Sequence, residues 1–113
     1  MKSLTSIEPD IKKLRDLIVE LINPDKIILF GSYAYGEPTE KSDIDLLVIK
    51  NGIEHTIEEE AKLATAIYYK TKELGISLVC DAFLENETYV NKNAQSGGTY
   101  ADALERGMVL YAR

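Results

Sequence analysis

The chain carries IILFGSYAYGEPTEKSDIDLLVI at residues 27–49, two apolar runs joined by a polar segment. The first run ends at Gly31-Ser32, ten residues follow, and Asp43-Ile44-Asp45 leads into the second run. Side chains two residues apart on a strand share a face, so these carboxylates are expected roughly 7 Å apart along one edge. Like charges this close are unfavourable unless a cation neutralises them. Mg²⁺ prefers oxygen ligands and commonly binds together with phosphate, so the pattern predicts a phosphate-and-metal site.

A third acid, Asp81, interrupts the apolar run at residues 76–83. Its charge would be costly if buried without a partner. If this run forms a strand beside residues 44–49, Asp43, Asp45 and Asp81 converge. Such a patch suits two metal ions about 3.5–4 Å apart, which stabilise the attacking and leaving oxygens in phosphoryl transfer. Gly31 and Ser32 are the expected phosphate contacts, because glycine admits close backbone approach and N–H groups that open a helix attract anions.

Other phosphate and hydrolase motifs fit the sequence less well. A P-loop requires Lys-Ser/Thr where Glu37-Pro38 stands, and no G-x-G-x-x-G motif for a dinucleotide occurs. A serine triad needs a histidine, and His55 is expected to be a surface residue near a helix start. The chain also lacks the Cys/His cluster of a zinc site. These absences exclude a Walker-type NTPase and favour a site made of carboxylates.

The bulk properties predict one soluble domain over residues 1–113. A net charge of −6 argues against direct nucleic-acid binding, which calls for a basic surface. The only cysteine, Cys80, suits a reducing cytosol and is expected to be a small buried strand residue. No uncharged stretch approaches the roughly 20 residues of a membrane helix, and no targeting segment is visible, so a cytoplasmic location without a membrane is expected.

Hydrophobic periodicity predicts alternating helices and strands, and therefore an α+β fold with one mixed sheet covered by helices. Helices are expected at residues 7–22, 56–74, 85–93 and 100–106, and a short helical turn at 33–35. Strands are expected at residues 26–30, 44–49, 76–83 and 108–111. Asn23-Pro24 should end the first helix, because the residue before proline disfavours the α region.

Gly-Ser, ten residues and Asp-x-Asp together closely resemble the minimal nucleotidyltransferases of the polymerase-β-like superfamily. The resemblance extends to Asp81 and to an ending like residues 105–111, and it implies a small mixed sheet of about four strands flanked by helices. By position, it implies that Gly31 and Ser32 bind the nucleotide phosphates and that Asp43, Asp45 and Asp81 bind Mg²⁺. Asp81 would also help to deprotonate the attacking hydroxyl.

Small members of this family resemble the antitoxins of HEPN/MNT toxin–antitoxin pairs. That resemblance implies transfer of AMP from ATP, with two Mg²⁺ ions, to a tyrosine of a partner HEPN ribonuclease toxin. One departure is Tyr35, which stands where many relatives have an arginine that can contact the triphosphate; Lys41 is a candidate substitute. Two alternatives stay open: an inactive antitoxin that neutralises its partner by binding alone, and nucleotide transfer to a small molecule or RNA.

Overall fold

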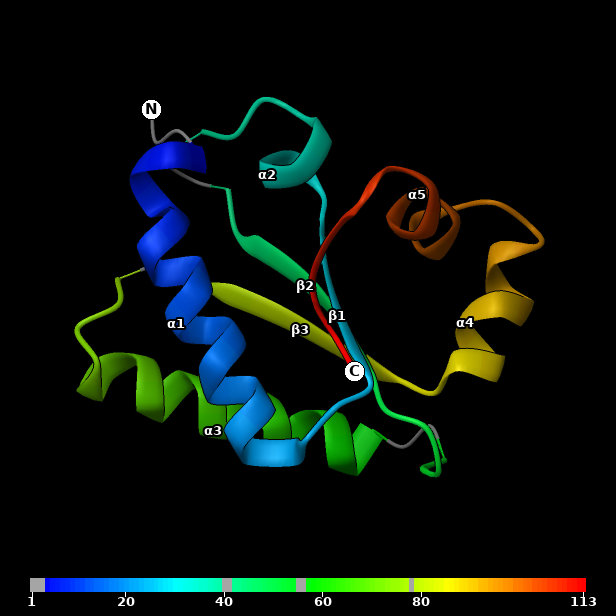
Figure 1. Ribbon diagram of the computed structural model, residues 1–113, viewed down its shortest axis with the longest axis horizontal. Helices are drawn as coiled ribbons and strands as arrows, with labels where there is room; N and C mark the ends of the chain where they lie inside the picture. The colour runs from blue at the N-terminus through cyan, green and yellow to red at the C-terminus, as the bar shows by residue number, and fades with distance from the viewer. Residues whose placement is uncertain (1–3, 40–41, 55–56, 78) are drawn as a thin grey trace.

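The computed structural model describes residues 4–39, 42–54, 57–77 and 79–113, which form one four-stranded mixed sheet with helices on both faces (Figure 1). In chain order the elements are α1 Leu4–Ile22, β1 Lys26–Phe30, α2 Ser32–Tyr35, β2 Ile44–Ile49, α3 Ile57–Glu73, β3 Cys80–Glu85, α4 Glu87–Ala94, α5 Thr99–Arg106 and β4 Met108–Ala112. The expected α+β fold class is confirmed.

The sheet has the strand order β3-β2-β1-β4. Strand β1 pairs antiparallel with both β2 and β4, whereas β2 and β3 run parallel. The starts of β2, β3 and β4 and the end of β1 therefore lie at the same end of the sheet. This edge of the sheet is called the acid end below, because it carries Asp45 and Asp81.

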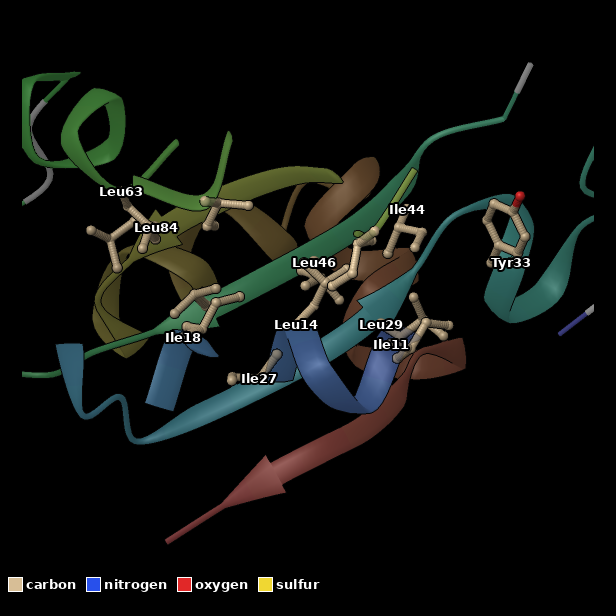
Figure 2. Close-up of a cluster of buried hydrophobic side chains, with 13 residues drawn as sticks. Ile11, Leu14, Ile18, Ile27, Leu29, Tyr33, Ile44, Leu46, Leu63 and Leu84 are labelled. Atoms are coloured by element: carbon tan, nitrogen blue, oxygen red, sulfur yellow. The ribbon is translucent and has the colours of Figure 1, made fainter. Parts of the chain in front are cut away.

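One face of the sheet packs against α1 and α3 (Figure 2). Apolar residues three and four apart along α1, such as Leu14 and Ile18, form the stripe that a helix needs to cover a sheet. The residues of this first cluster are fully or nearly buried: Ile11, Leu14, Ile18, Ile27, Leu29, Tyr33, Ile44, Leu46, Val48, Leu63, Ile67, Ile76 and Leu84.

The opposite face packs against the helical pair α4 and α5. Alternate strand residues supply this second cluster, because successive side chains of a strand point to opposite faces. Its buried members are Ile28, Phe30, Leu47, Ile49, Val90 and Ala103, and Tyr35, Phe83 and Tyr100 pack against them. Both faces of β2 are thus covered, which explains why its sequence is apolar apart from Asp45.

The strands at 26–30 and 44–49 are confirmed with the expected bounds, and α1 ends at Ile22, directly before Asn23-Pro24. The third strand, expected at 76–83, is wrong at both ends, because β3 spans Cys80–Glu85. Pairing with β2 sets its length, since the parallel register runs from Ile44–Cys80 to Ile49–Glu85. The next helix begins later than expected because the Asn86 side chain caps it, accepting the Tyr89 N–H at 2.7 Å.

In the part of the chain that the structure describes, no helix combines the length and apolar character needed to span a bilayer. His55 and Lys41, expected from the sequence to be a surface residue and a candidate phosphate contact, lie outside the described residues.

Candidate active site

Three predicted carboxylates meet at the acid end of the sheet. Asp45 on β2 pairs with Phe30 of β1 on one side and with Asp81 of β3 on the other. Strand alternation puts Asp45 and Asp81 on the face of the second cluster, together with Leu47 and Phe83. Asp43 lies two residues before Asp45 and is close enough to Asp81 for a side-chain hydrogen bond. The structure therefore brings all three acids together.

Burial and the proximity of other carboxylates disfavour the charged forms of Asp45 and Asp81. Partial burial, followed by the charges of Asp81 and Asp43, raises the pKa of Asp45 to about 6. Burial also raises the pKa of Asp81, and the charge of Asp43 and the hydrogen bond with it add to the shift. Without a cation, a proton between carboxylates relieves part of the repulsion. A divalent ion would relieve it more fully.

The chemistry of these donors fits Mg²⁺, which binds carboxylate oxygens and keeps several water ligands. Within the described ranges, however, no group of three His, Cys, Asp or Glu side chains is arranged to hold a metal ion. A bound ion would therefore have to draw the three carboxylates closer together. The residues that would hold the ion are Asp43, Asp45 and Asp81.

Gly31 ends β1 in a backbone conformation that favours glycine, with φ 76° and ψ −157°. A Cβ atom at this position would collide with the Asp45 carboxylate, so only glycine allows the main chain to lie against that acid. The N–H groups of Ala34 and Tyr35 bond the Gly31 carbonyl at 3.0 and 3.1 Å and close the α2 turn. The N–H groups of Ser32 and Tyr33 precede these bonds and so have no partner within the turn.

One cation at this end of the molecule was not expected from the sequence. The guanidinium of Arg106 lies 4.2 Å from the centre of the Tyr35 ring, and its Nη2 donates to the Tyr35 carbonyl at 3.4 Å. Tyr35 stands where many relatives have an arginine, and in this chain Arg106 of α5 places a cation against it. The only sequence signal was a basic residue directly before Gly107, where α5 ends.

Cys80 lies next to Asp81, but its side chain belongs to the other face, packed against the first cluster. Burial, with the charges of Asp81, Asp45 and Asp43, raises the pKa of the thiol to about 12. The thiol is therefore protonated at neutral pH and is a poor nucleophile or ligand. Its role as a small packed strand residue agrees with the expectation.

A hollow of about 730 Å³ lies at the other end of β2 and β3, between residues 51–53 and 86–92. Three of its polar residues, Asn51, Asn86 and Glu87, are engaged in hydrogen bonds. The Asn51 side chain accepts from the Glu87 N–H at 3.1 Å and donates to the Glu87 carboxylate at 3.3 Å. Asn86 donates to the Ile53 carbonyl at 3.0 Å while it caps α4. We therefore assign these groups to the packing of the turn, and the acid end remains the candidate active site.

A sequence model described as "Nucleotidyltransferase domain" matches residues 11–99, which include all three acids and the Gly31 turn. The chain belongs to this family. The resemblance to minimal nucleotidyltransferases is confirmed.

Three similar proteins illustrate the relationship. "Putative protein adenylyltransferase MJ0604" from Methanocaldococcus jannaschii is 38% identical over 87 residues, which cover 76% of this chain and 77% of that protein. The crystal structure of "a putative nucleotidyltransferase from Sulfolobus solfataricus" has a TM-score of 0.64 at 20% identity, covering 100% of this chain and 90% of the other. The structure of a "toxin-antitoxin with AMP-PNP" has a TM-score of 0.56 at 20% identity, covering 90% and 73%. The two structures share the fold.

Proposed function

We propose that this nucleotidyltransferase is a Mg²⁺-dependent protein adenylyltransferase, an antitoxin that transfers AMP from ATP to a tyrosine of a partner HEPN ribonuclease toxin. The observation that carries the proposal is the meeting of Asp43, Asp45 and Asp81 beside the Gly31 turn. The name of the Methanocaldococcus jannaschii relative supports protein as the acceptor. The fold shared with a toxin–antitoxin complex that contains AMP-PNP supports ATP and a toxin partner.

Each site residue has a defined task in this reaction. The N–H groups that open α2 and the Ser32 hydroxyl hold phosphate oxygens, and Gly31 allows the nucleotide to approach the main chain. Asp43, Asp45 and Asp81 hold Mg²⁺, which when bound supplies charge neutralisation at the phosphates. Asp81 is the most exposed of the three acids by residue class and is open to an incoming acceptor. Its carboxylate takes the proton of the acceptor hydroxyl.

The bonds that change are those of adenylyl transfer to a tyrosine. The phenolic oxygen of the acceptor tyrosine forms a bond to the α-phosphorus of ATP. The bond from that phosphorus to the oxygen bridging to the β-phosphate breaks, and pyrophosphate leaves with the electron pair. The product is an AMP–tyrosine phosphodiester, and the phenolic proton ends on Asp81. No oxidant or reductant takes part.

The test incubates the purified chain with Mg²⁺, ATP labelled on the α-phosphate, and the toxin encoded next to its gene. Label on a toxin tyrosine is expected with the wild type and is expected to be lost with Asp43→Asn/Asp45→Asn. The matched control is Asp16→Asn, since Asp16 is an exposed acid on α1 that pairs with Arg15. Thermal unfolding of each variant shows whether it is folded.

A second candidate is an inactive antitoxin that neutralises the toxin by contact alone. It is favoured by the arrangement of the described acids, which do not form a set of three metal ligands. The same incubation separates the two functions. Neutralisation of the toxin without any label, unchanged in Asp43→Asn/Asp45→Asn, would overturn the adenylyltransferase proposal and support the binding function.

A further inference from the structure

Arg106 reaches the acid end because of how α5 joins β4. The antiparallel register pairs Leu29 with Met108, so the two residues before Met108 lie beside the end of β1. Gly107 holds this junction tightly, since a Cβ atom there would lie 3.0 Å from the Leu29 carbonyl oxygen and closer still to Ile28. The last residue of α5 is therefore placed next to the strand that ends at Gly31.

Arg106 also lies on the face of the sheet that carries the acids. Helix α5 packs on the second cluster through Ala103, and the Tyr35 ring packs against the same cluster. Asp45 and Asp81 point to this face by strand alternation. In Figure 1, α2 lies above the end of β1, and α5 lies to the right of the sheet, on the side away from α1. A guanidinium and three carboxylates thus flank one end of one face.

The contacts of Arg106 fix the guanidinium without neutralising it. Its Cζ lies over the Tyr35 ring, 4.2 Å from the ring centre, and one N–H donates to the Tyr35 carbonyl at 3.4 Å. A guanidinium carries five N–H donors, so these contacts leave the other donors for a planar or tetrahedral oxyanion. Tyr35 is thus a positioning residue for this cation.

Among the residues that the structure describes, no carboxylate pairs with Arg106. The other two arginines differ: Arg15 pairs with Asp16 at 2.9 Å, and Arg113 pairs with Asp25 at 3.6 Å. Arg106 is thus an exposed cation without an acidic partner in the described part of a chain with a net charge of −6. An anionic ligand would give it one.

We propose that Arg106, held on the Tyr35 ring, binds the β- and γ-phosphates of the nucleoside triphosphate and then the departing pyrophosphate. This inference rests on the proposed nucleotidyl transfer. Two Mg²⁺ ions would not neutralise three carboxylates and a triphosphate, so a protein cation beside the phosphates stabilises the bound nucleotide and the charge that develops on the leaving group. The α-phosphate and the nucleoside lie outside its contacts.

The test measures binding of Mg²⁺ with a non-hydrolysable ATP analogue and, separately, with AMP, by calorimetry on the full chain. Arg106→Gln is expected to weaken binding of the analogue about tenfold or more, the scale of one charge-assisted contact, and to change AMP binding less than about twofold. Arg106→Lys is expected to keep part of the affinity. Tyr35→Arg placed in the Arg106→Gln background is expected to restore it. Arg113→Gln, an arginine at the opposite end of the sheet, is the matched control.

Several outcomes overturn the inference. In the first, Arg106→Gln binds the analogue as tightly as the wild type does. In the second, Arg106→Gln loses the same affinity for the analogue and for AMP. In the third, Tyr35→Arg does not restore binding of the analogue. Arg106→Lys keeps the charge, so it remains informative if Arg106→Gln unfolds. If wild type and Arg106→Gln label the toxin and bind the analogue alike, only this inference fails. If wild type binds neither nucleotide, the proposed function fails with it.

Discussion

Gly31 and Asp45 are coupled because the main chain of one occupies the space beside the carboxylate of the other. A glycine with positive φ is common in turns, where its role is only conformational. Here the missing Cβ has a second effect, since it leaves room for the Asp45 carboxylate beside the main chain. This contact with Asp45 distinguishes the Gly31 turn from the other glycine turns of the chain.

Gly31→Ala is expected to cost more stability than the same change at Gly52. Both glycines have positive φ, 76° and 85°, but a Cβ at Gly52 meets nothing within 4 Å. We expect Gly52→Ala to lower the free energy of unfolding by about 1 kcal/mol through backbone strain alone. Gly31→Ala should lower it by about 3 kcal/mol, because the clash with Asp45 adds to the strain. Urea unfolding measures both, and equal losses would contradict the proposed coupling.

Asp45→Asn is expected to stabilise the metal-free protein at pH 8. The pKa of Asp45 in the folded chain is about 6, above the ordinary 3.8, so the folded state holds this proton more tightly than the unfolded state. Stability from this group therefore falls as pH rises from about 4 to about 6, and the loss persists at higher pH. Asparagine removes the titration.

The measurement is thermal unfolding of both proteins in the presence of a chelator, from about pH 4 to about pH 8. The advantage of Asp45→Asn over wild type should be present at pH 8 and shrink towards pH 4. Asp16→Asn, at an exposed α1 acid, controls for a change in net charge. An advantage that does not vary with pH would contradict the assignment to the Asp45 carboxyl group.

At the scale of elements, α5 determines what surrounds the acid end, and a buried polar contact holds α5 in place. Glu85 at the end of β3 is 2% exposed, and the Tyr100 hydroxyl donates to its carboxylate at 3.0 Å. Burial and the neighbouring Glu85 raise the pKa of Tyr100 above its usual range, so the phenol remains a donor at physiological pH. This contact joins the first turn of α5 to the sheet, and Gly107 anchors its other end.

Tyr100→Phe is expected to destabilise the fold by about 1–3 kcal/mol, because it removes one donor from a buried carboxylate. Tyr69→Phe is the matched control, since Tyr69 is 63% exposed on α3. Hydrogen exchange should also show faster opening of α5 in Tyr100→Phe than in wild type, while α1 is unchanged. Equal stability of the two variants would show that the hydroxyl does not anchor the helix.

The predictability of the elements follows from how local their causes are. β1 and β2 are central strands whose apolar runs stop where burial stops, so the sequence predicts their bounds correctly. β3 is an edge strand whose limits depend on its register with β2, a contact that no local pattern encodes. On its outer edge, the Leu84 N–H donates to the Glu60 carboxylate of α3 at 3.0 Å.

The site also combines residues that local sequence places with one that only long-range packing places. The Gly-Ser and Asp-x-Asp pattern and Asp81 all lie on or next to apolar runs, so the strands expected from those runs are enough to bring the three acids near one another. Arg106 joins Tyr35 from 71 residues away, and the contact depends on the register of β4 and the packing of Gly107. Sequence spacing cannot predict a contact of that kind.

The molecule as a whole has two packed faces and one electrostatically costly end. Two apolar clusters hold the sheet between the helical layers, whereas at the acid end burial and neighbouring carboxylates raise the pKa of Asp45 and of Asp81. Such a site reduces the stability of the free protein, and a cation that binds there should return it. Stability and metal binding are therefore linked through the same carboxylates.

Mg²⁺ is thus expected to raise the melting temperature, measured in a buffer first cleared of metal by a chelator. Binding to the folded chain alone stabilises it by about 2.7 kcal/mol at a free concentration 100 times the dissociation constant. Asp43→Asn/Asp45→Asn should start from a higher melting temperature than wild type and gain nothing from Mg²⁺, because the repulsion and the ligands disappear together. Asp16→Asn should respond as wild type does, and NaCl at equal ionic strength measures the contribution of screening. A double variant that is stabilised by Mg²⁺ as much as wild type would place the ion elsewhere on this acidic chain.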